Sequence, residues 1–449
     1  RFNDDDSAYM TTTGLGTPTS KRAATFSFWI KRGNLGINTA FFGGESDSND
    51  YGQIGFDSSD NIQCYIEING ATELNLVTTA KYRDPSAWYH VALIIDGSQG
   101  TAADRAKLYV NGTQVTVFGT EEYMDQNTDL AFLETHLPAN AFIGVRKQGG
   151  SLSRHFDGYI AEAVYLDGTS AAIGDLGEFD SDSPRIWKPK DVSSLTFGNN
   201  GFYLDFEDSG NLGDDESGNT LDFSETNLAA TDQSSDSPTN NFATMNSMDR
   251  GDITSAMAFS EGNLKTAAGS GSTSWTTRYA FSSMGVTAGK WWVEAKCVDS
   301  GASNQFYIGV LKDKETETWN SSLGGVSGGW GYYSNDGSIY YLGSHTGGTT
   351  VTYTDGDFIG MALDVTNGTL QFYKNGSASG NQVTSLSTTS TWWFAHNGYA
   401  AIDAEWNFGN PPYSISSGNA DDNGYGNFEH APPSGFLALC TKNLGSDGG

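Results

Sequence analysis

Short runs of β-branched and aromatic residues, each ended by Gly, Asn, Asp or Ser, recur along this chain of 449 residues. Typical runs are residues 24–31 and 88–95, and helical periodicity is almost absent. Closely spaced strands separated by such turn residues are typical of antiparallel β-sandwiches. The sequence therefore predicts an all-β protein made of antiparallel β-sandwich (jelly-roll-like) domains.

Two Asn-Gly pairs mark expected hairpin tips. Asn111-Gly112 separates two β-rich runs, and Asn375-Gly376 follows the run Leu370–Lys374. Both central residues of a type I′ turn need a positive φ, which Asn and Gly tolerate best. The two pairs lie in similar settings, so we expect two sandwiches of related design.

The composition between the two hairpins predicts where the sandwiches join. Residues 205–252 are poor in branched apolar side chains and rich in Asp, Asn, Ser, Thr and Gly. Such a segment buries little surface, so we expect a connector there. The expected division is a sandwich over 1–190, an acidic connector over 191–254, a sandwich over 255–444 and a flexible tail over 445–449.

The charge of the chain excludes several partners. Acidic residues outnumber basic residues 54 to 24, which gives a formal net charge of −30. A uniformly acidic surface repels the phosphates of nucleic acids and anionic lipids. No apolar run approaches the roughly 18 residues of a membrane span. We therefore expect no nucleic-acid partner and no membrane insertion.

The segment 325–329 matches the G-x-S-x-G pattern of a hydrolase elbow, with Ser327 as its serine. That elbow needs a strand before the serine and a helix after it. Residues 330–333 are strand-like, so we interpret the pattern as a glycine-rich loop and not as a nucleophile.

Asp403 and Glu405 have the spacing of paired carboxylates on one strand, as glycoside hydrolysis on a sandwich requires. A glucanase-type strand has a further carboxylate two or three positions along, where this chain has Trp406 and Asn407. The alternative is a surface-facing pair at a strand edge. We predict no catalytic residue.

Calcium is the one metal that the sequence suggests. Residues 208–219 place many oxygen-bearing side chains among turn residues, which suits Ca²⁺. The spacing does not match an EF-hand loop, and the alternative is an acidic, solvated connection. The candidate ligands are Asp208, Asp214, Asp215 and Glu216.

Aromatic doublets occur at residues 291–292, 332–333, 340–341 and 392–393. Neighbours on a strand point to opposite faces, so each doublet places one ring outward. An outward ring beside Asn, Asp and Gly loops is a platform for a sugar. The alternative is that loops or the other domain cover these rings. The candidate ligand-binding residues are Trp330, Tyr332, Tyr341 and Trp392.

Two families resemble parts of the chain. Residues 1–190 resemble a laminin-G-like, concanavalin-type sandwich, and residues 255–444 resemble a SPRY domain. The first resemblance rests on Phe26–Arg32, Trp88–Ala92, Leu108–Gly112 and Phe156–Glu162. The second rests on Gly289–Glu294, Phe306–Val310, Gly329–Tyr333, Gly356–Asp364, Leu370–Gly376 and Asn407–Gly409.

The joining segment and the C-terminal end resemble virion proteins of tailed phages, notably marine ones, in which a laminin-G-like domain precedes a SPRY-like one. The similar pieces are Gly201–Phe206, Leu212–Asn219, Asp236–Ala243 and Gly435–Leu444. The resemblance implies a tail fibre, a capsid fibre or a similar appendage on the outside of the particle. It implies other virion proteins as partners and a homo-oligomer, with a trimer as the expected state.

Three functions follow from these observations. The first is a non-enzymatic virion protein, exposed outside the cell, that binds a host-surface glycan or protein and gains avidity by oligomerisation. The second is a secreted bacterial lectin or a carbohydrate-binding module. The third is a polysaccharide depolymerase, which a concanavalin-type fold alone does not establish.

Overall fold

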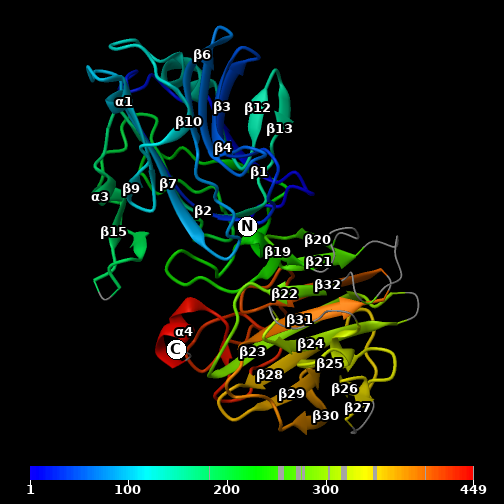
Figure 1. Ribbon diagram of the computed structural model, residues 1–449. Coiled ribbons are helices and arrows are strands. Elements are labelled where there is room, and N and C mark those ends of the chain that lie inside the picture. The colour runs from blue at the N-terminus through cyan, green and yellow to red at the C-terminus, as the bar shows by residue number, and fades with distance from the viewer. Residues whose placement is uncertain are drawn as a thin grey trace. The chain divides into compact units, whose positions relative to one another are not determined.

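The computed structural model describes residues 1–181, 183–250, 257–268, 275, 279–301, 304–314, 321–346, 351–399 and 401–447 (Figure 1). The chain is 45% strand and 7% helix, which confirms the all-β prediction. It divides into two compact units, Arg1–Gln233 (unit 1) and Ser234–Gly449 (unit 2). Each unit contains two large antiparallel sheets.

Unit 1 is built from an eight-stranded and a six-stranded sheet (Figure 1). The larger sheet has the order β10 (Phe118–Glu122), β6 (Ala71–Thr78), β5 (Ile62–Ile68), β4 (Asp50–Phe56), β3 (Thr39–Asp47), β11 (Asn140–Ile143), β1 (Tyr9–Thr13) and β18 (Ser224–Thr226). The smaller sheet has the order β17 (Phe202–Leu204), β14 (Gly158–Asp167), β2 (Ala23–Arg32), β7 (Trp88–Asp96), β8 (Ala106–Val110) and β9 (Thr113–Gln114).

Short elements complete unit 1. Two hairpins pair β12 (Arg146–Gln148) with β13 (Ser151–Ser153) and β15 (Gly177–Phe179) with β16 (Trp187–Pro189). The helical turns are α1 (Ala102–Arg105), η1 (Phe132–His136), α2 (Leu137–Ala139), α3 (Ile173–Leu176) and η2 (Ala230–Asp232).

The core of unit 1 lies between its two large sheets. Alternate residues point inward, so Phe26 and Phe28 of β2 pack on Phe42 of β3, with ring centroids 5.2 and 5.3 Å apart. A second apolar cluster, which includes Val164 and Phe197, covers the opposite face of the six-stranded sheet. Both faces of that sheet are therefore packed.

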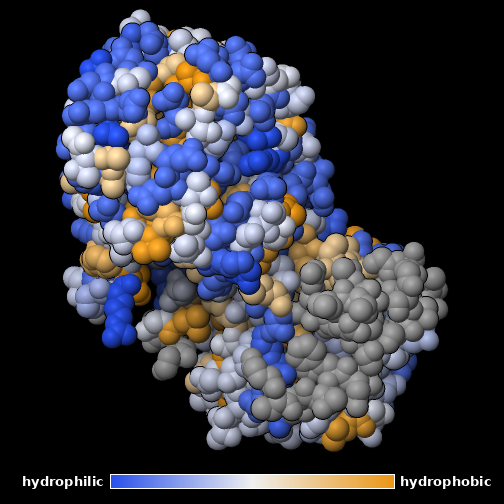
Figure 2. Space-filling model, turned by 45° about the horizontal axis from the view of Figure 1, so that its top comes forward, coloured by the Kyte–Doolittle hydropathy of each residue, from blue (hydrophilic) through white to orange (hydrophobic). Residues whose placement is uncertain are grey.

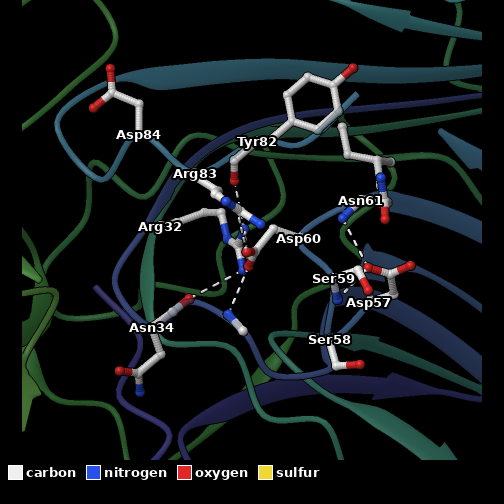
Figure 3. Close-up of polar contacts among 12 residues, drawn as sticks. Arg32, Asn34, Asp57, Ser58, Ser59, Asp60, Asn61, Tyr82, Arg83 and Asp84 are labelled. Atoms are coloured by element: carbon white, nitrogen blue, oxygen red, sulfur yellow. Dashed lines mark hydrogen bonds and ion pairs between the residues drawn. The ribbon is translucent and has the colours of Figure 1, made fainter. Parts of the chain in front are cut away.

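Arg32 and Asp60 tie together the loops that join β2 to β3, β4 to β5 and β6 to β7 (Figure 3). The Arg32 Nη1 atom lies 3.1 Å from Asp60 Oδ1 and donates to the Tyr82 carbonyl at 2.6 Å. The backbone N–H of Gly36 donates to Asp60 Oδ1 at 2.7 Å, and Arg83 Nε lies 2.9 Å from Asp60 Oδ2. The side chains of Arg32 and Asp60 are only 1% and 7% exposed, so this is a buried ion pair.

The stretch 191–254, expected as a connector, is divided between the units. Its first part supplies β17 and β18 to the sheets of unit 1, and Leu212 and Phe223 belong to that core. Asp215 organises this polar segment, because its carboxylate accepts the backbone N–H groups of Tyr203 at 2.9 Å and Leu221 at 2.9 Å. The later part supplies β19 (Met245–Arg250) to unit 2.

Unit 2 is built from a seven-stranded and an eight-stranded sheet. The first continues from β19 to β22 (Tyr279–Ser282), β31 (Trp392–Gly398), β24 (Phe306–Lys312), β25 (Gly329–Tyr333), β26 (Ile339–Tyr341) and β27 (Ser344–His345). The second contains β20 (Met257–Ser260), β21 (Lys265–Ala268), β32 (Ile402–Asn407), β23 (Lys290–Asp299), β28 (Phe358–Asp364), β29 (Thr369–Lys374) and β30 (Ser377–Val383), with β33 (Leu437–Ala438) parallel to β23. Its helices are η4 (Leu323–Gly325) and α4 (Thr441–Asp447).

Buried carboxylates anchor the C-terminal segment of unit 2. Glu294 of β23 accepts the backbone N–H groups of Glu429 at 2.9 Å and His430 at 2.8 Å. Asp421 accepts two backbone N–H groups through Oδ1, and through Oδ2 it accepts the backbone N–H of Ala438 at 2.8 Å. The segment is thus held to the sheet through backbone N–H groups that donate to buried carboxyl oxygens.

Both Asn-Gly pairs form the predicted tips. Asn111 and Gly112 have φ values of 48° and 73°, and Asn375 and Gly376 have 47° and 77°. Each pair forms a two-residue loop, between β8 and β9 and between β29 and β30. These observations confirm the type I′ hairpins.

Replacing Gly376 with alanine should lower the free energy of unfolding by about 1–2 kcal/mol, because an L residue is strained in the left-handed region. A Cβ there would also lie 2.6 Å from Cδ2 of His430, whose Nδ1 is 3.1 Å from Glu294. The control is Gly343→Ala, which has a similar φ of 72° and nothing within 4 Å of a Cβ. Urea unfolding should give a larger loss for Gly376→Ala, and equal losses would show that the His430 contact contributes nothing.

Hydrophilic residues cover most of the described surface drawn in Figure 2, and hydrophobic residues form only small patches there. Among the described residues, no helix combines the length and the apolar character needed to cross a membrane.

Candidate functional site

Trp330 and Tyr341 lie together on neighbouring strands of unit 2. They are direct partners in the pairing of β25 with β26, and their rings stack with centroids 4.5 Å apart and planes at 14°. Trp330 is only 7% exposed, while Tyr341 is half-buried. The structure therefore brings these two predicted residues together, with Tyr341 as the more accessible ring.

Tyr332 and Trp392, the other two predicted ligand-binding residues, are core residues. Each is only 1% exposed. The Tyr332 hydroxyl lies 2.8 Å from Ser379 Oγ, and Trp392 Nε1 donates to the Ser387 carbonyl at 2.9 Å. In these positions neither ring reaches the surface, because alternation along each strand turns it toward the opposite sheet.

In the two tyrosine doublets the outward rings are Tyr333 and Tyr340, which were not among the candidate ligand-binding residues. Both rings of the doublet 291–292 are buried, so neither of them is accessible to a ligand. Tyr333 stacks on Tyr307 with centroids 4.3 Å apart, and Tyr340 meets both rings edge-on at 5.9 Å. A hydrogen bond of 2.6 Å to Asp336, together with burial, raises the pKa of Tyr340 to about 12. On the outer face of the seven-stranded sheet, the half-buried rings of Tyr333 and Tyr340 thus pack on the buried ring of Tyr307.

The four predicted calcium ligands do not converge. Within the described residues no three His, Cys, Asp or Glu side chains form a group that could hold a metal ion. The Asp208 side chain accepts the backbone N–H of Gly210 in its own turn. Both carboxyl oxygens of Asp215 accept backbone N–H groups, those of Tyr203 and Leu221. Asp214 and Glu216 lie near one another, and the pKa of Glu216 is raised chiefly by the charge of Asp205.

Asp403 and Glu405 lie on the same face of β32, as their spacing indicates. Glu405 is held in an ion pair with Lys296 at 2.9 Å. Burial raises the pKa of Asp403. Glu405 is thus engaged with a cation, and β32 itself carries no third carboxylate. Asp299 of β23 is the direct partner of Asp403 in the pairing of these strands, and its charge adds to the rise in the pKa of Asp403.

Two serine motifs do not have the geometry of a nucleophile. Ser327 is followed by β25 and not by the helix that an elbow requires. Ser27 Oγ lies 2.8 Å from His90 Nε2, but Trp187 Nε1 donates to His90 Nδ1 at 3.0 Å. An indole only donates, so Nδ1 is unprotonated and Nε2 carries the hydrogen toward Ser27. His90 therefore cannot take a proton from this serine.

A row of side-chain amides crosses three strands on the outer face of the eight-stranded sheet in unit 1. Gln53 of β4 donates to Gln63 of β5 at 3.3 Å, and Gln63 donates to Asn75 of β6 at 3.3 Å. The neighbouring residues in these strands, such as Cys64 and Leu76, point into the core. The outer face of this sheet is therefore polar, whereas the outer face of the six-stranded sheet is packed.

Two tyrosines lie beside the amide row. Tyr51 and Tyr65 have ring centroids 5.6 Å apart, and the Tyr65 hydroxyl donates to Glu67 at 2.6 Å. Burial and this hydrogen bond raise the pKa of Tyr65 to about 12. The guanidinium of Arg146, from β12, lies 5.5 Å from the centre of the Tyr51 ring.

Rings beside amide and carboxylate groups provide what a polyhydroxylated ligand needs, an apolar surface and several hydrogen-bonding groups. The sequence analysis missed this face, although a signal for it existed. In β5 the residues Gln63, Tyr65 and Glu67 alternate with apolar residues, which marks a strand with one polar outer face.

Comparisons with known families identify both domains. Residues 4–170 match the family described as the concanavalin A-like lectin/glucanases superfamily, and residues 290–391 match the SPRY domain family. The chain therefore contains a concanavalin A-like domain followed by a SPRY domain, in the order that the sequence resemblance indicated. A comparison with curated proteins found no match.

Parts of the chain are also similar to solved structures. The SPRY domain of human HERC1 is 22% identical, with 32% of this chain and 87% of that chain covered and a TM-score of 0.28. A putative carbohydrate binding protein from Bacteroides ovatus is 16% identical, with coverages of 49% and 56% and a TM-score of 0.31. A heptameric SAP-like pentraxin from Limulus polyphemus is 16% identical, with coverages of 38% and 75% and a TM-score of 0.27.

Proposed function

We propose that this chain is a non-enzymatic protein of the outside of a phage virion, a tail or capsid fibre or a similar appendage, that binds a glycan on the host cell. The observation that carries the binding role is the outer face of the eight-stranded sheet, where Tyr65 lies beside the amides of Gln53, Gln63 and Asn75. The stacked Trp330 and Tyr341 are a second candidate surface.

The geometry of the candidate catalytic residues supports a protein that binds its ligand without catalysing a reaction. Ser327 is followed by a strand and not by the helix that a nucleophile elbow needs. Trp187 donates to His90 Nδ1, so His90 cannot accept a proton from Ser27. Glu405 forms an ion pair with Lys296. The virion location rests on the resemblance of the segments around residues 201–243 and 435–444 to phage proteins. We propose that the chain acts as a homo-oligomer, most simply a trimer, because repeated weak sites raise avidity.

Binding of the full chain to bacterial surface polysaccharides and whole envelopes tests this function, with reducing-end release followed in the same tubes. We expect binding without release. Tyr65→Ala should weaken it about tenfold or more, because a lost aromatic contact costs about 1.4 kcal/mol or more. Trp330→Ala and Tyr341→Ala test the second surface. The control is Tyr109→Ala, a half-buried tyrosine on the six-stranded sheet of unit 1.

Sugar release would overturn the non-enzymatic role and direct attention to Asp403 and Glu405. An absence of binding to every polysaccharide and envelope would overturn the receptor-binding role. Antibody labelling of purified phage particles tests the location separately, because a secreted lectin would leave the particles unlabelled.

A further inference from the structure

Two arginines lie next to the proposed glycan-binding face. Arg146 begins β12, and Arg154 directly follows β13. This hairpin packs against β3, where a Cβ on Gly43 would lie only 2.9 Å from the carbonyl oxygen of Val145 (Figure 1). Gly43 pairs with Gln53 of β4, so the hairpin lies beside the end of the amide row. Tyr51, two residues before Gln53, interacts electrostatically with both arginines.

Several buried atoms of this group have unused hydrogen-bonding capacity. Gln53 is only 3% exposed, and its Nε2 donates to Gln63. Among the described residues, Gln53 Oε1, Arg146 Nε and Arg154 Nη1 are buried and have no hydrogen-bond partner. Leaving such atoms unpaired is unfavourable, because burial removes their hydrogen bonds to water and nothing in the protein replaces them. A ligand that supplies an acceptor for the two N–H groups and a donor for Gln53 Oε1 would remove this cost.

The charge of the group is also unusual for this molecule. Although acidic residues outnumber basic ones 54 to 24, neither Arg146 nor Arg154 makes an ion pair with any carboxylate in the described parts of the chain. The nearby Glu67 accepts the Tyr65 hydroxyl, and Glu45 lies 3.8 Å from Lys147. Burial lowers the pKa of both arginines, and the charge of Arg146 lowers the pKa of Arg154 further. The charges of Glu45 and Glu67 on Arg146, and of Asp57 on Arg154, oppose this lowering without forming an ion pair among the described residues. The two guanidinium groups therefore repel each other, which an anion would relieve.

We infer that Tyr51, Gln53, Arg146 and Arg154 form an acidic-sugar site that binds the carboxylate of a uronic or sialic acid residue. The inference rests on the proposed glycan-binding function and names its ligand class. The carboxylate oxygens accept from Arg146 Nε and Arg154 Nη1, since guanidinium groups match carboxylates in geometry and charge. Gln53 Oε1 accepts a sugar hydroxyl, and Tyr65 contacts the apolar face of the ring.

The test uses the full chain with alginate, polygalacturonate and polysialic acid, each compared with its carboxyl-reduced form. We expect at least one acid polymer to bind, and reduction of its carboxyl groups to weaken binding at least tenfold. Affinity should also fall with rising salt concentration. This comparison changes the ligand only, so it does not depend on the folding of any variant.

The matched protein variants are Arg146→Gln, Arg154→Gln and the control Arg22→Gln, which removes a more exposed arginine of the same unit. Each site variant should weaken binding of the acid polymer about tenfold and leave the reduced polymer unaffected, and Arg22→Gln should change neither. Equal binding of an acid polymer and its reduced form would overturn the acidic-sugar site but preserve the proposed function. Binding only to neutral polysaccharides would do the same. Failure to bind any glycan would overturn both.

Discussion

Replacing Asp60 with alanine is expected to lower the free energy of unfolding of unit 1 by about 3–5 kcal/mol, because it leaves a buried charge without its partner. The Arg32 side chain is only 1% exposed, and its cation is compensated by Asp60 at 3.1 Å. After the substitution Arg32 keeps carbonyl contacts such as the one to Tyr82, but no carboxylate. The loss also removes the acceptor for the Gly36 N–H, which loosens the β2–β3 loop.

Hydrogen exchange of the full chain, read by peptide mass spectrometry, measures this effect in each unit separately. Peptides of unit 1 should lose protection in Asp60→Ala, and peptides of unit 2 should not. The control is Arg83→Ala, which removes the other cation on the same carboxylate. Because the Arg83 side chain is 45% exposed, its loss should cost less than about 1 kcal/mol. Similar losses in the two variants would contradict a buried, stability-determining pair.

Acid is expected to destabilise unit 2 through His396. This ring is fully buried between Phe306 and Trp406, and neither of its nitrogens has a partner among the described residues. Burial lowers the pKa of His396 to about 3, against about 6.5 in the unfolded chain. The unfolded state therefore binds a proton below pH 6.5 that the folded state does not. The contribution of His396 to the free energy of unfolding is therefore fully present above pH 6.5. It falls by about 4–5 kcal/mol as the pH is lowered toward 3.

Urea unfolding at pH 7 and pH 4.5, followed by tryptophan fluorescence, checks this expectation. Eight of the eleven tryptophans belong to unit 2, so the signal reports mainly on that unit. Between these pH values His396 should account for about 3 kcal/mol of the loss. His396→Leu should remove that part of the loss, whereas His345→Leu, on an exposed ring, should retain it. An equal loss in wild type and His396→Leu would rule out His396 as the cause.

Local patterns were sufficient to predict the fold class. Alternating strands, and the Asn-Gly pairs at 111–112 and 375–376, depend on neighbouring residues alone. The segment 191–254 was harder to interpret, because a few apolar residues such as Phe202 and Phe223 reach the core of unit 1 from a polar background. Backbone donors bound by Asp215 hold this segment in place, and such contacts leave no periodic signal in a sequence.

The candidate site depended on contacts between distant residues. Because neighbouring side chains on a strand point to opposite faces, the sequence predicts that Tyr332 and Tyr333 diverge. It does not show which of the two points inward. Pairing of β25 with β26 brings Trp330 and Tyr341 together, and this register is fixed by the packing of both strands. Tyr51 and Gln53 lie about a hundred residues before Arg146 and Arg154 in the chain. Only the packing of the β12–β13 hairpin against β3 brings them close.

The carboxylates of Asp60, Asp215 and Asp421 hold their loops through backbone N–H groups. Every amino acid except proline has a backbone N–H, so these hydrogen bonds do not depend on which side chains the loop carries. Loop residues between the anchors can therefore change during evolution while the loop keeps its path. A binding surface whose partner changes during evolution benefits, because its loop side chains can be replaced without altering the loop conformation. In such a family, we expect the anchoring aspartates to persist while the residues beside them diversify.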